Sequence, residues 1–252
     1  MSLAARAGLV VLAGVLAAGC AATQPEYGSV PPKRRLSEIY VPGEPSLFTD
    51  VPDPWEGYNR RMYDINARLD RFLFIPVVES YKRVTPDFLQ SGIRNFFRNL
   101  LEISNFYNSV LQGRPVLAMR VAGRFVVNST LGVFGLLDPA SEMGLAHQRE
   151  DLGQTLGRWG IGPGPYLVLP VFGPSSLRDG VGFVGGTLIT AAIDPTGYYD
   201  WAAEREHWWS YLVWGINERA RQDFRYYESG SPFEYLLVRR LYLDLRDLEI
   251  AQ

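Results

Sequence analysis

The chain has 252 residues, of which 47% are apolar, 13% aromatic and 21% charged, with a formal net charge of −2 at pH 7. The apolar content excludes a disordered chain, and the charge balance argues against a nucleic-acid-binding protein, which would carry a basic patch. A single cysteine and two histidines, His147 and His207, exclude a disulfide framework, a cysteine-ligated zinc site and an iron–sulfur cluster. The 25 glycines and 17 prolines exceed the roughly one residue in eight of average proteins.

The N-terminus has the pattern of a secretory signal. Arg6 is followed by an uncharged run of small and apolar residues over 7–18, which is shorter than the ~20 residues of a membrane-spanning helix. Small residues then precede Cys20 and resemble a bacterial lipobox, at which the signal is cleaved and the cysteine is acylated. We therefore expect 1–19 to be a lipoprotein signal peptide and Cys20 to be the lipid-attachment site; the alternative is an ordinary secretion signal with an incidental cysteine.

Composition divides the remaining chain into two parts. Residues 20–52 are rich in proline, which prevents regular helices and sheet ladders, so we expect a lipidated, extended tether there. Residues 53–252 are expected to form a single domain.

Apolar periodicity in this domain predicts helices. Spacings of three and four from Trp55 to Phe72 indicate an amphipathic helix that Pro76 interrupts. Thr85-Pro86 has the form of a helix start, and further helices are expected from Pro115, from Asp200 towards Phe224, and from the capping-box sequence Ser231–Glu234. Four leucines recur along that last helix, at positions 237, 241, 245 and 248.

Three segments carry no charged residue: 125–137, 159–177 and 180–193. The longest contains four prolines, and the other two are too short to span a bilayer as helices. We interpret them as elements that lie at a membrane interface or line a cavity. A buried hydrophobic core with many turns is the alternative.

The sequence contains no convincing catalytic or metal-binding motif. A Ser–His–Asp arrangement could assemble only in space, with Ser175 or Ser176 as nucleophile and His147 as base. Two distant histidines and isolated acidic pairs do not form a ligand set for a metal, and neither a P-loop nor a dinucleotide fingerprint is present. We therefore expect that the protein is not an enzyme and that it binds neither a metal nor a cofactor.

Three stretches resemble the MlaA (VacJ) family of outer-membrane lipoproteins, over about residues 50–225. The first is Asp53-Pro54-Trp55-Glu56-Gly57-Tyr58-Asn59-Arg60, and the second runs from Arg124 through Gly132-Val133-Phe134-Gly135 to Asp138. The third and most characteristic includes Gly162, Gly164, Pro165, Tyr166, Pro170, Gly173, Arg178 and Asp179.

The resemblance implies a mainly α-helical, ring-shaped lipoprotein that lies in one membrane leaflet and has a central amphipathic channel. Such proteins maintain outer-membrane lipid asymmetry by removing mislocalised phospholipids, which a periplasmic MlaC-like carrier then takes up. Their ring docks beside a porin trimer in some members. Gly132, Val133, Phe134 and Gly135 match a loop beside the channel, where backbone flexibility is implied to matter for gating.

Location and function follow as expectations. Ala21, in place of Asp, favours export to the outer membrane, with the anchor on the periplasmic-leaflet side. The function expected is passive retrograde phospholipid transport, with phospholipid, a porin trimer and a lipid carrier as partners and no nucleic acid. A structural lipoprotein that scaffolds a porin complex and a phospholipid hydrolase remain as alternatives.

Overall fold

The computed structural model describes residues 53–252; the expected signal peptide, the tether and Cys20 lie outside this range. The described chain is mainly helical and has one two-stranded sheet, which confirms the expected fold class. In chain order the elements are α2 (Glu56–Leu69), the π-helix η2 (Asp70–Phe74), α3 (Ile75–Val84), α4 (Asp87–Leu111), α5 (Pro115–Thr130), α6 (Pro139–Glu142), α7 (Leu152–Arg158), β1 (Tyr166–Leu169), β2 (Gly173–Ser176), α8 (Leu177–Ile193), α9 (Tyr198–Ala203), α10 (Trp209–Arg219) and α11 (Glu234–Ala251).

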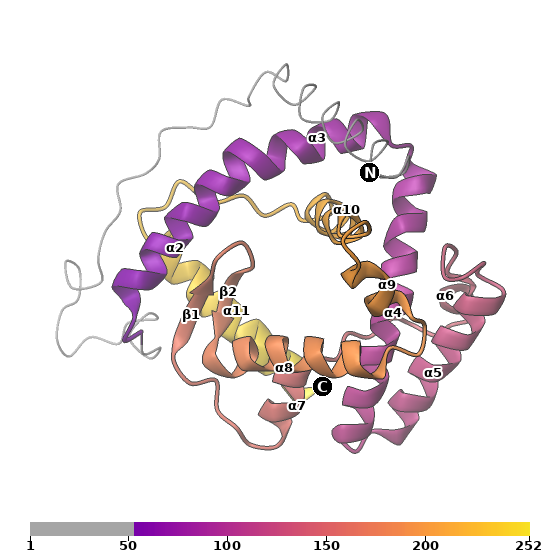
Figure 1. Ribbon diagram of the computed structural model, residues 1–252. Helices are drawn as coiled ribbons and strands as arrows, with labels where there is room; N and C mark the ends of the chain where they lie inside the picture. The colour runs from indigo at the N-terminus through magenta and orange to yellow at the C-terminus, as the bar shows by residue number, and fades with distance from the viewer. Residues whose placement is uncertain (1–52) are drawn as a thin grey trace.

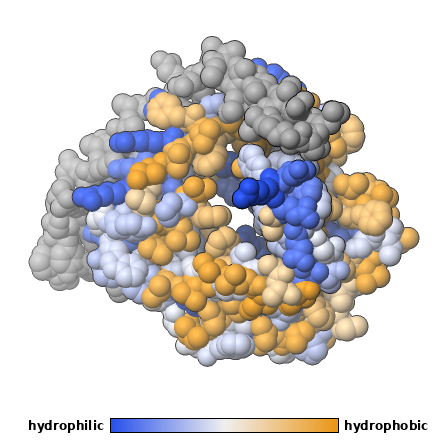
Figure 2. Space-filling view, in the orientation of Figure 1, coloured by the Kyte–Doolittle hydropathy of each residue, from blue (hydrophilic) through white to orange (hydrophobic). Residues whose placement is uncertain are grey.

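The elements follow one another around an open centre (Figure 1). α2, η2 and α3 form one long arc, α4 continues from its end, and α5 runs back beside α4 at the periphery. α7, α8, the β-hairpin and α11 lie on the other side, and α10 projects inside the circuit. The space-filling view has an opening near the same centre (Figure 2).

Pro76 does not interrupt the first helix, contrary to expectation. The π-helix η2 ends just before α3, and α2, η2 and α3 run on without a break. A proline within an α-helix clashes with the carbonyl one turn earlier, and the wider π-turn leaves room for its ring. Asp70 in this turn accepts hydrogen bonds from Arg219 Nε and Nη2, at 2.7 and 2.8 Å. The π-turn therefore holds the end of α10 inside the circuit.

α4 packs on α9 and α10 through apolar side chains, in the usual manner of helices. Phe97 and Leu100 of α4 form a buried cluster with Tyr198 of α9. Trp214 of α10 stacks on Phe97 with ring centroids 5.6 Å apart. This face of α4 carries apolar residues at spacings of three and four, with Ile93, Phe96, Phe97 and Leu100 in the sequence.

The single helix expected from Asp200 to Phe224 is wrong. α9 begins after Gly197, whose positive φ of 69° suits a glycine, and ends at Ala203. The charged residues 204–206 separate it from α10, which ends before Phe224. Periodicity alone missed the break because aromatic residues continue at helical spacing on both sides of it.

α11 begins at Glu234 rather than at the capping box that starts with Ser231. The Ser231 hydroxyl accepts a hydrogen bond from the backbone N–H of Phe233, at 3.2 Å, within a turn. The Glu234 carboxylate instead accepts a hydrogen bond from Tyr63 Oη of α2, at 2.7 Å. The Glu234 carboxylate that a capping box would use is therefore engaged in a long-range contact with Tyr63.

Two asparagines of α2 hydrogen-bond to the free edge of the hairpin, as a neighbouring strand would. β1 pairs antiparallel with β2, from Tyr166 opposite Ser176 to Leu169 opposite Gly173. On the other edge of β1, Asn59 donates to the Tyr166 carbonyl at 3.0 Å and accepts from the Val168 N–H at 2.8 Å. One hydrogen-bonding step along, Asn66 donates to the Leu169 carbonyl at 2.9 Å and accepts from the Val171 N–H at 2.8 Å. The spacing of seven residues, or two helical turns, lets both amides face the strand.

Replacing Asn66 with alanine should destabilise the fold by about 1–3 kcal/mol, because a buried strand edge would lose a donor and an acceptor together. The matched control is Asn95→Ala, which removes one exposed hydrogen bond to the Leu136 carbonyl and should cost less than about 1 kcal/mol. The control also loses a long hydrogen bond from Arg94, at 3.4 Å. Thermal or chemical unfolding in detergent measures both variants. Equal losses in the two variants would contradict this role of Asn66.

Candidate functional site

The described part of the molecule has an inverted distribution of polarity. Of its buried residues, 24 are polar or charged and 18 are hydrophobic, whereas 41 large hydrophobic residues are exposed. Water-soluble monomers rarely expose apolar patches beyond a few hundred Å², and extended ones mark a membrane or protein interface. The exposed apolar surface is therefore the first functional feature of this fold.

The inversion is visible on single helices. α2 buries Asn59, Tyr63 and Asn66, and its apolar positions Tyr58 and Ile65 are exposed. α11 buries Tyr235, Leu236, Arg239 and Arg246 among others, and its periodic leucines point outward. Those exposed leucines are Leu237, Leu241, Leu245 and Leu248. The sequence identified the apolar stripes of α2 and α11, and the structure shows that both face away from the interior.

The three uncharged segments also lie largely at the surface. α8 contains all of the third, and six apolar side chains of this segment are exposed: Val181, Phe183, Val184, Leu188, Ile189 and Ile193. The hairpin tip exposes Val171 and Phe172, although β1 buries Tyr166 and Val168. A buried hydrophobic core is therefore wrong for most of these residues. In Figure 2 the surface over α8 is mostly hydrophobic, and the side of the opening formed by α9 and α10 is hydrophilic.

No helix in the range 53–252 combines the length and the apolar character needed to cross a membrane.

The first family-like motif forms a polar contact between α2, β1 and α11. Asp53 accepts a hydrogen bond from Asn59 Nδ2 at 2.8 Å and an ion-paired one from Arg239 Nη1 at 3.2 Å, and Tyr235 also donates to it. Arg60 pairs with Glu56 one turn earlier, at 2.7 Å.

Arg60 extends this contact to α11, because its guanidinium lies 4.4 Å from the centre of the Tyr235 ring. Pro54 lies in the turn that precedes α2. The motif residues thus hold two distant parts of the chain together.

The third motif opens α8. The first N–H groups of a helix have no partner within it, and here Leu177 and Arg178 donate theirs to the carbonyls of Pro165 and Pro163, at 3.0 and 3.1 Å. Ser176 caps the helix by accepting from the Asp179 N–H at 3.1 Å. Gly164 and Gly173 have positive φ, as glycines in turns commonly do, and Gly162 and Pro170 lie in the same connecting loops.

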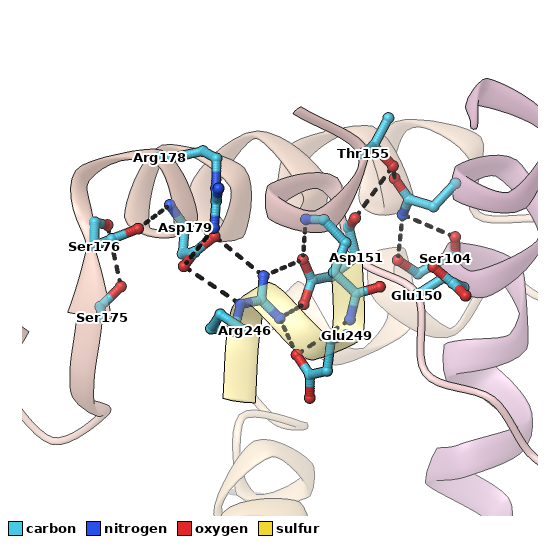
Figure 3. A network of polar contacts seen from close by, with 12 residues as sticks. Ser104, Glu150, Asp151, Thr155, Ser175, Ser176, Arg178, Asp179, Arg246 and Glu249 are labelled. Atoms are coloured by element: carbon cyan, nitrogen blue, oxygen red, sulfur yellow. Dashed lines mark hydrogen bonds and ion pairs between the residues drawn. The ribbon is translucent and has the colours of Figure 1, made fainter. Parts of the chain in front are cut away.

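Arg178 and Asp179 belong to a buried charge cluster that joins α7, α8 and α11 (Figure 3). Arg246 of α11 donates to both carboxylates that flank it, with Nη2 2.9 Å from Asp151 Oδ1 and 3.1 Å from Asp179 Oδ1. Arg178 donates to Asp179 at 3.0 Å, and Glu249 accepts from Arg246 Nη1 at 2.7 Å. Each positive charge is thus matched by carboxylate oxygens at hydrogen-bonding distance.

A close approach of two helices makes this cluster possible. A Cβ on Gly182 of α8 would lie 2.4 Å from the backbone nitrogen of Gly153 in α7. A Cβ on Gly153 would lie 2.6 Å from Asp179 Oδ1 and 2.9 Å from Arg246 Nη2. Both glycines are therefore required by packing.

The loop 132–135 is strained and packs against α4. Val133, Phe134 and Gly135 have positive φ angles of 52°, 56° and 86°, a conformation that is costly for a β-branched or aromatic residue. A Cβ on Gly132 would lie 2.4 Å from the Asn128 carbonyl oxygen. Phe134 is 78% exposed.

This loop lies on the face of α4 opposite to α10. Asn95 of α4 donates to the Leu136 carbonyl at 3.2 Å, and the site of a Gly135 Cβ falls 2.7 Å from Asn99 Cβ. Phe97, which contacts α10, is half a turn away from both asparagines. The loop is thus at the periphery in Figure 1, with α4 between it and the centre.

A second buried cluster fixes the base of the loop, and sequence reasoning missed its centre. Arg124 Nε donates to Glu102 Oε1 at 2.8 Å, and its Nη2 donates to Asp138 at 3.1 Å. Asn128 Nδ2 donates to the same Asp138 carboxylate at 2.9 Å, and Asn128 Oδ1 accepts from the Ala140 N–H at 3.1 Å. Glu102 carried no sequence signal beyond being an acidic residue on the polar side of a predicted helix.

The structure does not bring the candidate hydrolase residues together. His147 Nδ1 lies 2.9 Å from Glu102 Oε1, in the cluster between α4 and α5. Ser176 is fully buried at the start of α8, where its hydroxyl caps the helix. Neither residue is hydrogen-bonded to the other in the described chain. The same part of the chain contains no group of His, Cys, Asp and Glu side chains suited to a metal ion.

The Asp179 carboxylate should make folding sensitive to acid. Burial raises its pKa, but hydrogen bonds from Arg246 and Arg178 outweigh this and lower the pKa of Asp179 to about 2. Its stabilisation of about 2 kcal/mol is therefore complete above the unfolded-state pKa, near 4, and is lost as pH falls towards 2. Unfolding measured from pH 6 to 2 should show this loss in the wild type and a shallower one in Asp179→Asn.

At pH 7 the Asp179→Asn variant should itself lose about 3–5 kcal/mol, because it breaks a buried pair. The matched control is Asp244→Asn, which removes an exposed partner of Arg240 and should change stability by less than about 1 kcal/mol. A wild-type acid transition that is unchanged in Asp179→Asn would refute the assignment.

Gly132→Ala should destabilise the protein by about 1–3 kcal/mol, because the new methyl group meets backbone atoms that cannot move independently. Gly123→Ala in α5 is the control: its Cβ would lie 3.7 Å from Leu145 Cδ1, and the change favours helix formation. A Gly132→Ala variant as stable as Gly123→Ala would show that the loop is not packed in this way.

Comparison with known proteins assigns the chain to a family. The family model described as MlaA lipoprotein matches residues 51–249. The intermembrane phospholipid transport system lipoprotein MlaA of Shigella flexneri is 34% identical over 202 residues, which cover 77% of each chain. The protein of the same description from Escherichia coli (strain K12) is 33% identical with equal coverage. An uncharacterised protein of Rickettsia prowazekii (strain Madrid E) is 37% identical over 150 residues, and the chain spans 59% of that relative's length.

A solved structure concerned with the structural basis for maintenance of bacterial outer membrane lipid asymmetry has the same fold. It matches with a TM-score of 0.62 and 31% sequence identity, covering 79% of this chain and 99% of that one. The residues matched by the family model include the charge cluster at the start of α8 and the loop that follows α5. The chain belongs to the MlaA lipoprotein family.

Proposed function

We propose that this protein is a passive phospholipid-conducting lipoprotein of the outer membrane. It removes misplaced phospholipids from the outer leaflet through its central opening and passes them to a soluble periplasmic carrier of the MlaC type. The observation that carries the proposal is the inverted polarity: 41 large hydrophobic residues are exposed around an interior rich in hydrogen-bonded polar groups. Family membership supports it, since the relatives from Shigella flexneri and Escherichia coli are described as phospholipid transport lipoproteins.

The exposed apolar surface suits residence in one leaflet of the bilayer. Acyl chains would cover the outward side chains of α2, α8 and α11, whose exposure to water would otherwise cost about 25 cal/mol per Å² of apolar area. Cys20 would add covalent acyl chains on the periplasmic-leaflet side, and two or more such chains anchor a protein stably. A porin trimer beside the ring is a further partner that we propose from the family.

The opening suits a lipid because its walls differ in polarity. The hydrophilic surface on the side of α9 and α10 can face a head group, and the hydrophobic surface over α8 can face acyl chains (Figure 2). We further propose that the strained loop 132–135 acts on the channel through α4, because its asparagine contacts lie on the helix that also packs on α10.

A clean deletion should raise the amount of phospholipid at the cell surface and the sensitivity of the cells to detergent. The wild-type gene should restore both phenotypes, and Cys20→Ala should restore them poorly, because the chain would lack its anchor. Surface phospholipid is measured with an impermeant phospholipase added to whole cells. Unchanged surface phospholipid in the deletion strain would overturn the transport function.

Two measurements separate the alternatives. A hydrolase would release fatty acid or lyso-lipid from vesicles, and His147→Gln would reduce that release; we expect no release from the purified wild type. A pure scaffold would bind porin without carrying lipid, whereas we expect phospholipid to co-purify with the protein.

A further inference from the structure

Three arginines outside the family-like motifs converge where α4 packs on α10. Arg94 and Arg98 are one turn apart on α4, and Arg221 follows the end of α10. Asn217 of α10 donates a hydrogen bond of 3.1 Å to the Gln90 carbonyl of α4, which holds the two elements together at this point. Arg94 and Arg98 are half-buried there.

Arg94 and Arg98 are half-buried and Arg221 is exposed, and none of the three has a close carboxylate partner among residues 53–252. Arg98 makes neither a hydrogen bond nor an ion pair with any residue of the described range. Arg94 has a hydrogen bond of 3.4 Å to its neighbour Asn95, and the nearest carboxylate oxygen to Arg221, on Glu218, is 3.9 Å away. All three guanidinium groups therefore keep donors available.

Other arginines of the described residues pair closely with carboxylates. Arg124 and Arg246 each lie within 3.1 Å of two different carboxylates. Arg219 donates to both oxygens of Asp70. Within residues 53–252 these arginines are closely paired with carboxylates, whereas the half-buried Arg94 and Arg98 and the exposed Arg221 are not.

The absence of a close carboxylate beside Arg98 is energetically costly. Burial, and then the charges of Arg221 and Arg94, lower the pKa of Arg98 below its ordinary value; Glu218 and Asp138 oppose this without outweighing it. A half-buried cation beside like charges destabilises the fold unless an anion joins it. Guanidinium groups bind phosphate oxygens through pairs of N–H donors, so a phosphate is the anion that such a group fits best.

We propose that Arg94, Arg98 and Arg221 form a subsite that binds the phosphate of a phospholipid passing through the opening. The inference rests on the proposed function, because it requires lipid to reach the α4–α10 side of the molecule. The hydrophilic surface there and the hydrophobic surface over α8 would orient the lipid, with its phosphate on the arginines and its acyl chains towards α8 (Figure 2). Free phosphate has the same chemistry and is tested separately.

The test compares the full-length lipidated protein with the triple variant Arg94→Gln, Arg98→Gln, Arg221→Gln, in detergent. Arg120→Gln is the matched control, because Arg120 is exposed on α5 and has no ion pair within residues 53–252. Titration with phosphatidylglycerol in mixed micelles should show binding at least about tenfold weaker in the triple variant, since several charge-assisted hydrogen bonds are lost. Arg120→Gln should bind as the wild type does.

Stability separates a binding role from a structural one. The lipid-free triple variant should melt at the same temperature as the wild type or higher, because repulsion between the arginines is relieved. Inorganic phosphate should raise the melting temperature of the wild type and leave that of the triple variant unchanged. A triple variant that melts well below the wild type would overturn the proposal in favour of a structural role.

The remaining outcomes distinguish the two proposals. Wild-type protein that binds no phospholipid would overturn the transport function and this subsite with it. Wild-type and triple-variant proteins that bind phospholipid equally would overturn the subsite alone. A response to inorganic phosphate without any difference in lipid binding would mean that the arginines bind free phosphate, and would also overturn the lipid subsite.

Discussion

The guanidinium of Arg246 lies between the carboxylates of Asp151 and Asp179 and so joins three helices whose sequences are far apart. The same arrangement recurs where Arg124 joins Glu102 and Asp138, and where Arg219 holds Asp70. In a protein with many outward-facing apolar residues, these contacts stabilise the interior alongside the buried apolar cluster of α4, α9 and α10. A buried ion pair adds little net stability over apolar packing, yet breaking one is costly. The clusters therefore determine which elements meet.

The helices could be predicted from the sequence, and their orientation could not. Apolar spacing correctly indicated α4 and the leucine stripe of α11, because both depend on local periodicity. Periodicity identifies two faces of a helix but not whether each face meets protein, lipid or water. The exposure of Leu241 and the burial of Asn59 therefore could not be predicted from it. Pro76 reads as a break because a π-turn before a proline leaves no signal in the sequence. The split between α9 and α10 was missed for a related reason, as the aromatic pattern continues across it.

The candidate site was recognised through its motifs, and the chemistry of those motifs became clear only in three dimensions. Asp53, Asn59, Arg178 and Asp179 act on residues more than a hundred positions away or on the start of a helix. Their partners Arg239 and Arg246 are seven residues apart on the face of α11 that lies opposite the leucines. That spacing is a signal, although it does not say which carboxylates the arginines meet. Glu102 and Asn66 had no such signal, because their roles are defined by distant backbone and side-chain groups.

The polar interior also affects how stability varies with temperature. Exposure of apolar surface on unfolding raises the heat capacity, and exposure of polar surface lowers it. A fold that buries more polar than hydrophobic residues must therefore unfold with a smaller heat-capacity change than a water-soluble domain of equal length. Its curve of unfolding free energy against temperature is correspondingly less curved, and its maximum lies at a lower temperature. The unfolding free energy of such a protein therefore falls almost linearly on warming, and cold denaturation is displaced to lower temperatures.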